Sequence, residues 1–237
     1  RVQRLDRRGD YSLGPDLLEH ASRKLIARFD EENGGFGSRP KFPNTMSLDV
    51  LLRRGALEGD SVALGSVKRA LDRMRAGGIW DHLRGGFHRY STDERWLVPH
   101  FEKMLYDNAL LLRLYVDGFR VFGDEAYAET ARAIVGYLFA EMQDESGAFY
   151  ASQDADSEGE EGTFFVWTPA QMKAALEGDA EAYEVARAHF GVTDEGNFEG
   201  SGASVLSAQK SLDRVAIALG LAPSDVEAAL ARAREKL

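Results

Sequence analysis

The chain has 237 residues, of which 44% are hydrophobic and 29% are charged, and its net charge at pH 7 is −10. This is the composition of an ordinary globular domain, and the acidic balance argues against nucleic acid and anionic membrane surfaces as partners. The absence of cysteine excludes disulfides, thiolate metal sites and cysteine nucleophiles within the chain, and with no signal-peptide pattern and no run of about 18 apolar residues it leads us to expect a cytoplasmic protein.

Two amphipathic helices are predicted near the beginning of the chain. The apolar spacing of the first starts at Pro15, a residue suited to the first helical position. It ends at Asn33-Gly34-Gly35, because glycine tolerates the left-handed conformation found at many helix ends. A second helix is predicted to start at Asn44 or Thr45 and to continue to about Leu57.

The next two predicted helices differ in character. One starts at Asp60 or Ser61, carries a single apolar face and ends at Gly77-Gly78. The other is predicted to start at Pro99 and has apolar residues on almost every face over positions 101–122. A helix that is apolar all round is buried among other helices, so this one is expected to be an inner helix.

The remaining pattern is also helical. Residues 125–143 carry a single apolar stripe, which is typical of an outer helix. Phe164 to Trp167 indicate a strand or an extended loop. Thr168 and Pro169 form a helix start, and at least three short helices are expected after it. Strands and helices do not alternate, which argues against a parallel α/β sheet.

A glycine-containing turn followed by phenylalanine recurs along the chain. The phenylalanines concerned are Phe36, Phe87, Phe149 and Phe198, which are 51, 62 and 49 residues apart. Such recurrence marks a repeat architecture, and each interval is about the length of a helical hairpin with its loops. We therefore predict an all-α fold, an incomplete (α/α) toroid of hairpins, with chemistry on the loops.

Both ends of the chain suggest a fragment of a longer protein. We expect residues 1–14, a polar segment without an initiator Met, to be a linker from a preceding domain, and residues 15–237 to be about half of a toroid. The chain stops inside an amphipathic pattern, without a helix C-cap signal. An incomplete ring leaves hairpin faces uncovered, which predicts an exposed apolar edge or self-association.

Polar residues gather at the start of the helix predicted from Pro99. They are Trp96, His100, Glu102, Lys103, Tyr106, Asp107 and Asn108. In such a helix Lys103 and Asp107 would lie one turn apart on the same face. Burying an unpaired charge costs free energy, so a cleft accounts for this many polar groups in an apolar helix. The alternative is an ordinary ion pair of Lys103 and Asp107.

A second group of polar residues surrounds the turn at Gly85-Gly86. It consists of His82, Arg84, His88 and Arg89, and Trp80 and Asp81 come just before it. Histidine is suited to proton transfer near neutral pH. The two histidines could ligate a metal with Glu102 or Asp107, but they do not form a known zinc motif, and we expect no metal. Hydrogen-bonded structural histidines are the alternative.

The loop that begins at Asp154 is strongly acidic. Asp154, Asp156 and Glu158 have the spacing of the first half of a calcium loop, but Phe165 stands where a bidentate Glu is required, so the motif fails. Aromatic residues flank the loop, and carboxylates beside aromatic rings are typical of sugar sites. A solvated acidic loop is the alternative. Earlier in the chain, Lys41 and Phe42 lie between two prolines that stiffen their loop. A ligand contact and a packing role are open alternatives for these two residues.

Four motifs in this order resemble the YyaL-like proteins, which include the spermatogenesis-associated, thioredoxin-domain-containing proteins of animals. They span Pro40 to Pro43, Gly77 to Ser91, Trp96 to Ala109 and Asp154 to Trp167. The resemblance implies an N-terminal thioredoxin-like domain, absent here, and a six-hairpin, glycosidase-like toroid similar to those of N-acylglucosamine 2-epimerase and cellobiose epimerase. It further implies that His88 and His100 correspond by placement to the histidines that move a proton beside a carbonyl in such epimerases.

From these observations we expect a carbohydrate-active domain, epimerase- or isomerase-like, working by general acid–base catalysis in the full-length protein. The alternatives are a toroid that binds a carbohydrate or another ligand without catalysis, and an interaction module for the thioredoxin-like domain. The candidate catalytic residues are His88, His100, Glu102 and Asp107. The candidate binding residues are Lys41, Phe42, Trp80, Asp81, Arg89, Trp96, Lys103, Tyr106, Asn108, Asp154, Asp156 and Glu158. We expect a sugar-like ligand, no cofactor, and partners in the absent domain and half-toroid.

Overall fold

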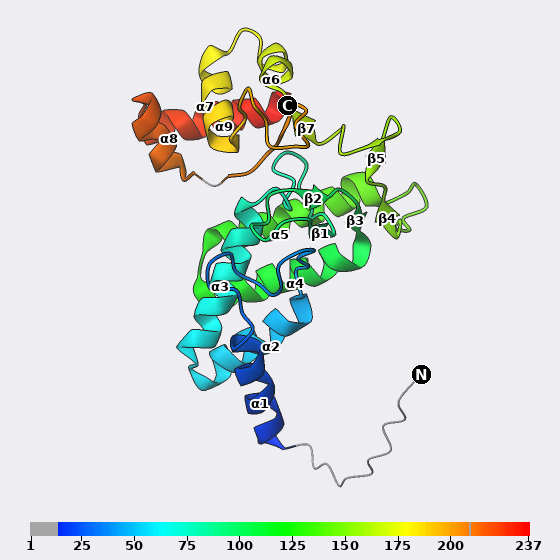
Figure 1. The fold of residues 1–237 in the computed structure, drawn as a ribbon, viewed down its shortest axis with the longest axis vertical. Coiled ribbons are helices and arrows are strands. Elements are labelled where there is room, and N and C mark those ends of the chain that lie inside the picture. The colour runs from blue at the N-terminus through cyan, green and yellow to red at the C-terminus, as the bar shows by residue number, and fades with distance from the viewer. Residues whose placement is uncertain (1–13, 209) are drawn as a thin grey trace.

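The computed structural model describes residues 14–208 and 210–237, and this part is mainly helical (Figure 1). The helices are α1 (Pro15–Ile26), α2 (Thr45–Glu58), α3 (Ser61–Ala76), α4 (Leu105–Phe122), α5 (Glu125–Tyr137), α6 (Pro169–Ala175), α7 (Ala180–Phe190), α8 (Leu212–Leu219) and α9 (Pro223–Lys236). A π-helical turn, η1 (Leu138–Met142), continues α5. The predicted linker, Gly14 excepted, lies outside the described residues. No helix of the described part is long and apolar enough to cross a membrane.

Short antiparallel strand pairs join the helices. They are β1 (Tyr90–Ser91) with β2 (Pro99–His100), β3 (Lys103–Met104) with β4 (Ser152–Gln153), β5 (Asp156–Ser157) with β6 (Glu160–Glu161), and β7 (Val166–Trp167) with β8 (Ser204–Val205). Each of these strands is two residues long, so the described part belongs to the all-α class, as predicted.

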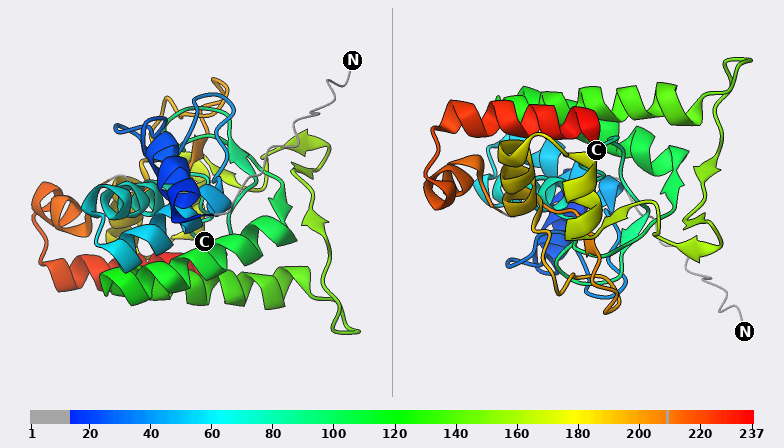
Figure 2. Two further views of the ribbon diagram at one scale, coloured as in Figure 1. Left: turned by 90° about the horizontal axis from the view of Figure 1, so that it is seen from below. Right: turned by 90° about the horizontal axis from the view of Figure 1, so that it is seen from above.

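The helices are arranged as hairpins around two hydrophobic cores. In the first core, α4 packs against α2 on one side and α5 on the other. The second core is built by α6 to α9, at the opposite end of the molecule from α1 (Figure 1). Two further views show α9 running along the same side of the molecule as α5 (Figure 2).

Side-chain caps define several of the predicted helix boundaries. The carboxylate of Asp60 accepts hydrogen bonds from the backbone N–H groups of Val62 and Ala63 at the start of α3. Thr168 and Gln171 form a capping box at the start of α6, with each side chain bonding the backbone of the other residue. Because capping depends on residues adjacent in sequence, these boundaries were accessible before the structure.

Three of the four recurring turns have the same local structure. In each, the phenylalanine after the turn forms a β-bridge with a residue before the turn. The three pairs are Phe29 with Phe36, Trp80 with Phe87, and Gln143 with Phe149. In each, an aspartate at the start of the loop accepts hydrogen bonds from backbone N–H groups two to four residues further along the chain. These aspartates are Asp30, Asp81 and Asp144. The turn at Phe198 differs, since this residue bridges forward to Ala203.

The predicted start of the fourth helix is wrong. Residues 99–104 are extended, and α4 begins only at Leu105. Pro99 and His100 pair with β1, and Lys103 and Met104 pair with β4. These pairings connect segments distant in sequence, and they override the helical apolar spacing. Lys103 therefore does not share a helix face with Asp107.

The expectation that α4 is buried on all sides is also wrong within the described residues. Tyr106, Leu110 and Val121 are 50%, 38% and 37% exposed. On the neighbouring α2, Met46 and Leu57 are 75% and 86% exposed. Exposed apolar side chains are therefore present on α2 and α4, and an apolar edge or self-association through them stays a prediction.

The tight turn at Gly86 gives a stability prediction. Gly86 has φ +80°, and a Cβ there would lie 2.5 Å from the Tyr137 ring; Gly123 has φ +65° and no atom within 4 Å of its Cβ position. Gly123→Ala should cost about 1–2 kcal/mol from backbone strain alone. Gly86→Ala should cost about 1–3 kcal/mol more from overpacking. Urea denaturation of both variants tests this, and equal losses would contradict it.

Candidate acid–base site

The first part of the site is a stack of rings at the β1–β2 pair. Tyr90 lies opposite His100 in the strand register, and their rings are stacked with centroids 5.0 Å apart. Phe42, just before α2, packs on Tyr90 with centroids 4.9 Å apart and is 42% exposed. The β1–β2 pair and the packing of Phe42 on Tyr90 thus bring the segments before α2 and α4 together at one surface.

His100 is held between two carboxylates. Its Nδ1 lies 2.7 Å from Oε1 of Glu161, and its Nε2 lies 3.6 Å from Oε2 of Glu102. Arg89 donates a hydrogen bond of 2.8 Å to the same Glu102 oxygen. Carboxylates on both ring nitrogens fix the orientation of the imidazole. The imidazole is therefore placed to hold or release a proton.

Asp107 stands in the first turn of α4 beside this group. Burial raises the pKa of its carboxyl to about 6; the charge of Arg89 opposes this rise, and that of Glu102 adds to it. Its Oδ2 is buried and has no hydrogen-bond partner among the described residues. A carboxyl with a pKa near neutrality can both accept and donate a proton at physiological pH.

His88 does not face this surface, and the expectation that it lies beside His100 in one open site is wrong. Its side chain is 2% exposed, its Nδ1 is 2.8 Å from the backbone oxygen of Phe101, and the rings of Phe101 and Phe165 pack edge-on against it. Burial and the charge of Lys103 lower its pKa to about 3, so the ring is neutral. Successive side chains of an extended segment point to opposite sides, so Arg89 points outward and His88 inward.

Lys103 forms a buried pair beneath the site. Its Nζ donates to Oδ2 of Asp81 at 2.7 Å and to the backbone oxygen of Gly85 at 3.0 Å, and it lies 4.4 Å from the ring centroid of Tyr137. Burial raises the pKa of Asp81, but the charge and hydrogen bond of Lys103, the charge of His88 and the backbone N–H of Arg84 together outweigh it and hold that pKa below its usual range. Lys41 and Asp30 form a similar ion pair at the first recurring turn, where Nζ of Lys41 lies 2.6 Å from Oδ2 of Asp30.

Several predicted binding residues are therefore interior, and the expectation that they line the surface around His100 and Asp107 is wrong. These are Lys41, Trp80, Asp81, Trp96, Lys103 and Asn108. The indole N–H of Trp96 donates a hydrogen bond to the backbone oxygen of Asn33. The side-chain amide of Asn108 accepts a hydrogen bond from the backbone N–H of Phe87 and donates one to its backbone oxygen. They hold the turns in place, which explains why polar and aromatic residues concentrate near the turns without reaching solvent.

The acidic loop reaches the site through a residue that the sequence did not single out. Asp154, Asp156 and Glu158 are exposed around the β5–β6 hairpin, whereas Glu161 contacts His100. Tyr90 was missed as well. No local signal distinguishes Glu161 from the other acids of its run. In the described residues, no group of three or more His, Asp or Glu side chains is arranged to hold a metal ion.

Hairpins of this kind, with polar groups gathered on the loops at one end, define a class, the (α/α) toroids. The chain matches the crystal structure of cellobiose 2-epimerase from Bacillus thermoamylovorans B4167 with a TM-score of 0.51 at 14% identity, covering 68% of this chain and 49% of that one. The fold is therefore part of a six-hairpin toroid, as expected, and it is incomplete.

Sequence comparison finds related proteins. The chain is 37% identical to spermatogenesis-associated protein 20 of Homo sapiens over 97% of its length, and 38% identical to that of Mus musculus over 91%. It is a homologue of spermatogenesis-associated protein 20. The chain spans about a third of these relatives, 33% and 30% of their lengths. No protein-family model matches the chain.

Proposed function

We propose that the full-length protein is a carbohydrate-active enzyme of the epimerase or isomerase type, with Asp107 and His100 as its acid–base groups on this part of the toroid. The observation that carries the proposal is the half-buried Asp107 carboxyl, whose pKa is about 6 and whose Oδ2 has no described partner. A structural carboxylate would be expected to be paired, as Asp81 is.

The reaction would begin with removal of a proton from the carbon beside a sugar carbonyl. Asp107 or His100 takes the proton, and the C–H electron pair moves to the carbonyl oxygen, which becomes an enolate. Arg89, which is 39% exposed at its side chain, stabilises that oxygen in place of the interior Lys103. Return of the proton to the same carbon from its other face completes an epimerisation, whereas return to the neighbouring carbon, with movement of a hydroxyl proton, completes an isomerisation.

Sugar as the substrate class is supported by the surroundings of these groups. Phe42 and Tyr106 expose 42% and 50% of their surface beside the polar cluster, so apolar rings and hydrogen-bonding groups are available together. The relative that shares the fold is by its name a cellobiose epimerase. The acid–base group needed on the opposite face of the sugar would come from the part of the toroid beyond this chain.

Two measurements on the full-length protein test the proposal. We expect at least one sugar from a panel of mono- and disaccharides to raise the melting temperature, and the same sugar to exchange the hydrogen at its carbon 2 for deuterium in heavy water. A thermal shift without exchange would instead indicate a carbohydrate-binding toroid. If neither the thermal shift nor the exchange is observed, the result favours an interaction module for the expected thioredoxin-like domain.

A further inference from the structure

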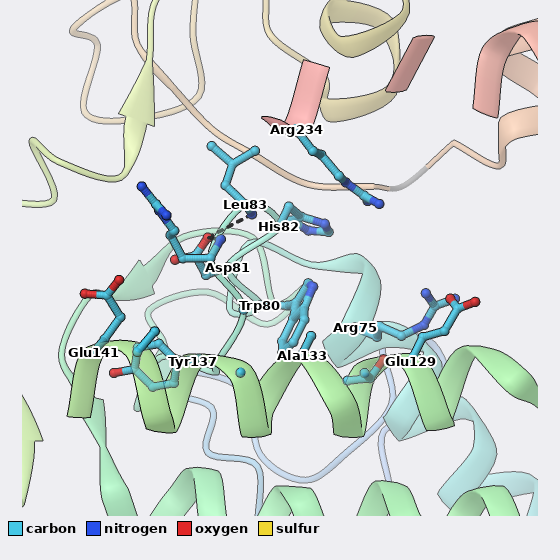
Figure 3. A pocket seen from close by; sticks show the side chains of 15 residues that line it. Arg75, Trp80, Asp81, His82, Leu83, Glu129, Ala133, Tyr137, Glu141 and Arg234 are labelled. Atoms are coloured by element: carbon cyan, nitrogen blue, oxygen red, sulfur yellow. Dashed lines mark hydrogen bonds between the residues drawn. The ribbon is translucent and has the colours of Figure 1, made fainter. Parts of the chain in front are cut away.

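A second cavity lies away from the acid–base site, where the two hydrophobic cores meet. It has a volume of about 450 Å³ and is bordered by α3, the turn after Trp80, α5 and the C-terminal turn of α9. Figure 3 shows Arg234 entering it from α9, opposite Trp80, His82 and Arg75. The sequence motifs do not point to this cavity, because its walls come from distant segments.

Two arginines in this cavity lack counter-ions. Neither Arg75 nor Arg234 forms an ion pair within 4.0 Å with a described residue. The Nε of Arg75 is buried without a hydrogen-bond partner, and the guanidinium of Arg234 lies 5.8 Å from the ring centroid of Phe190. Buried polar groups are normally hydrogen-bonded, so an unpartnered guanidinium nitrogen needs an explanation.

The surroundings neutralise this charge only in part, and Arg234 is itself an exposed residue at the mouth of the cavity. Burial of its guanidinium, and then the positive charge of Arg75, lower the pKa of Arg234, and the charge of Glu129 opposes this. His82 and His189 are neutral, with pKa values lowered to about 3 and about 4, mainly by burial. Nδ1 of His189 is also buried without a partner.

Three acids, Asp81, Glu129 and Glu141, line the wall of the cavity. Asp81 is paired with Lys103. Glu129 lies beside Arg75 (Figure 3) and is the one acid whose charge acts on Arg234, but neither it nor Glu141 is within 4.0 Å of either guanidinium, so two guanidinium groups face one carboxylate. The end of the cavity near the two arginines therefore carries an excess of positive charge.

We propose that this cavity binds a small oxyanion, a carboxylate or a phosphate group, between Arg75 and Arg234. The guanidinium group presents paired N–H donors that match the oxygens of either anion. Trp80 and Tyr137 supply an apolar wall for the rest of such a ligand. Because Arg75 belongs to the first group of helices and Arg234 to the second, the bound anion would join the two cores.

Thermal melting of the full-length protein with inorganic phosphate, with malonate, and with chloride at equal ionic strength tests this proposal. The effective oxyanion should raise the melting temperature by roughly 1 °C or more once it is about tenfold above its dissociation constant, and chloride should not. Calorimetric titration gives that constant, and comparison of the two oxyanions tells a phosphate site from a carboxylate site. Equal effects of all three salts would overturn the proposal.

Variants of the two arginines provide the second part of the test. Arg75→Gln and Arg234→Gln should each weaken binding at least tenfold, since each removes a charged hydrogen bond to the anion. Arg132→Gln, at an exposed arginine of α5, is the matched control and should bind as the parent does. If Arg75→Gln does not fold, Arg234→Gln decides the outcome. Undiminished binding by Arg234→Gln would overturn the proposal.

Discussion

Replacing His100 with alanine, or Asp107 with asparagine, in the full-length protein is expected to lower turnover by about 10²–10⁴-fold. His100 is held by Glu102 and Glu161, and the Asp107 carboxyl has a pKa of about 6. Each variant removes a group able to transfer a proton. Steady-state rates on a substrate found by the exchange assay measure the effect.

The pH profile should separate catalysis from stability. If Asp107 acts as a base, the rate should fall as the pH drops below about 6, and the asparagine variant should lose this dependence. The folded pKa is raised from 3.8 to about 6, so this group's contribution to stability is complete below pH 3.8 and is lost as pH rises through 6. Asparagine resembles the neutral acid, so at pH 7 the melting temperature should stay the same or rise slightly.

Matched controls exist for both variants. His20→Ala changes an exposed histidine on α1, and Asp225→Asn changes an exposed aspartate in the first turn of α9, the position that Asp107 holds in α4. Both controls should keep full activity. If the His100 and Asp107 variants unfold instead, the two residues are structural and the proposed acid–base site is lost.

Lys103→Met should have the largest effect on folding. The substitution leaves the carboxylate of Asp81, 9% exposed, buried without its cation. Breaking a buried ion pair by removing one partner costs about 3–5 kcal/mol. We expect a loss of that size in the free energy of unfolding, measured by urea denaturation, and a partial recovery when Asp81→Asn is added.

Lys68→Met is the control for this prediction. The Lys68 side chain is 43% exposed and pairs with Asp72 and Asp124 at 3.3 and 3.1 Å. Pairs accessible to solvent contribute about 1 kcal/mol or less. Similar losses for Lys68→Met and Lys103→Met would show that the buried pair has no special weight in this fold.

The proposed site was only partly accessible from the sequence. Arg89, His100, Glu102, Tyr106 and Asp107 were all selected as candidates, and the structure brings them together. They lie within one short segment whose strand pairing and helix start keep them close. Glu161 is 61 residues from His100 along the chain, and its contact depends on how the acidic hairpin folds back.

The sequence alone predicted most of the helices, the helix starts at Asp60 and Thr168 and three of the four recurring glycine turns, because these depend on apolar spacing and hydrogen bonds between residues a few positions apart. It did not predict that the first helix ends at Ile26 rather than at Asn33, or that α4 begins only at Leu105. It did not determine which polar residues are interior. His88 and Arg89 are neighbours, yet one is buried and the other reaches Glu102. Pro99 suits a helix start, yet it lies in a strand pair with Ser91. Only the tertiary structure decided these points, because burial and strand pairing depend on contacts between segments far apart in the chain.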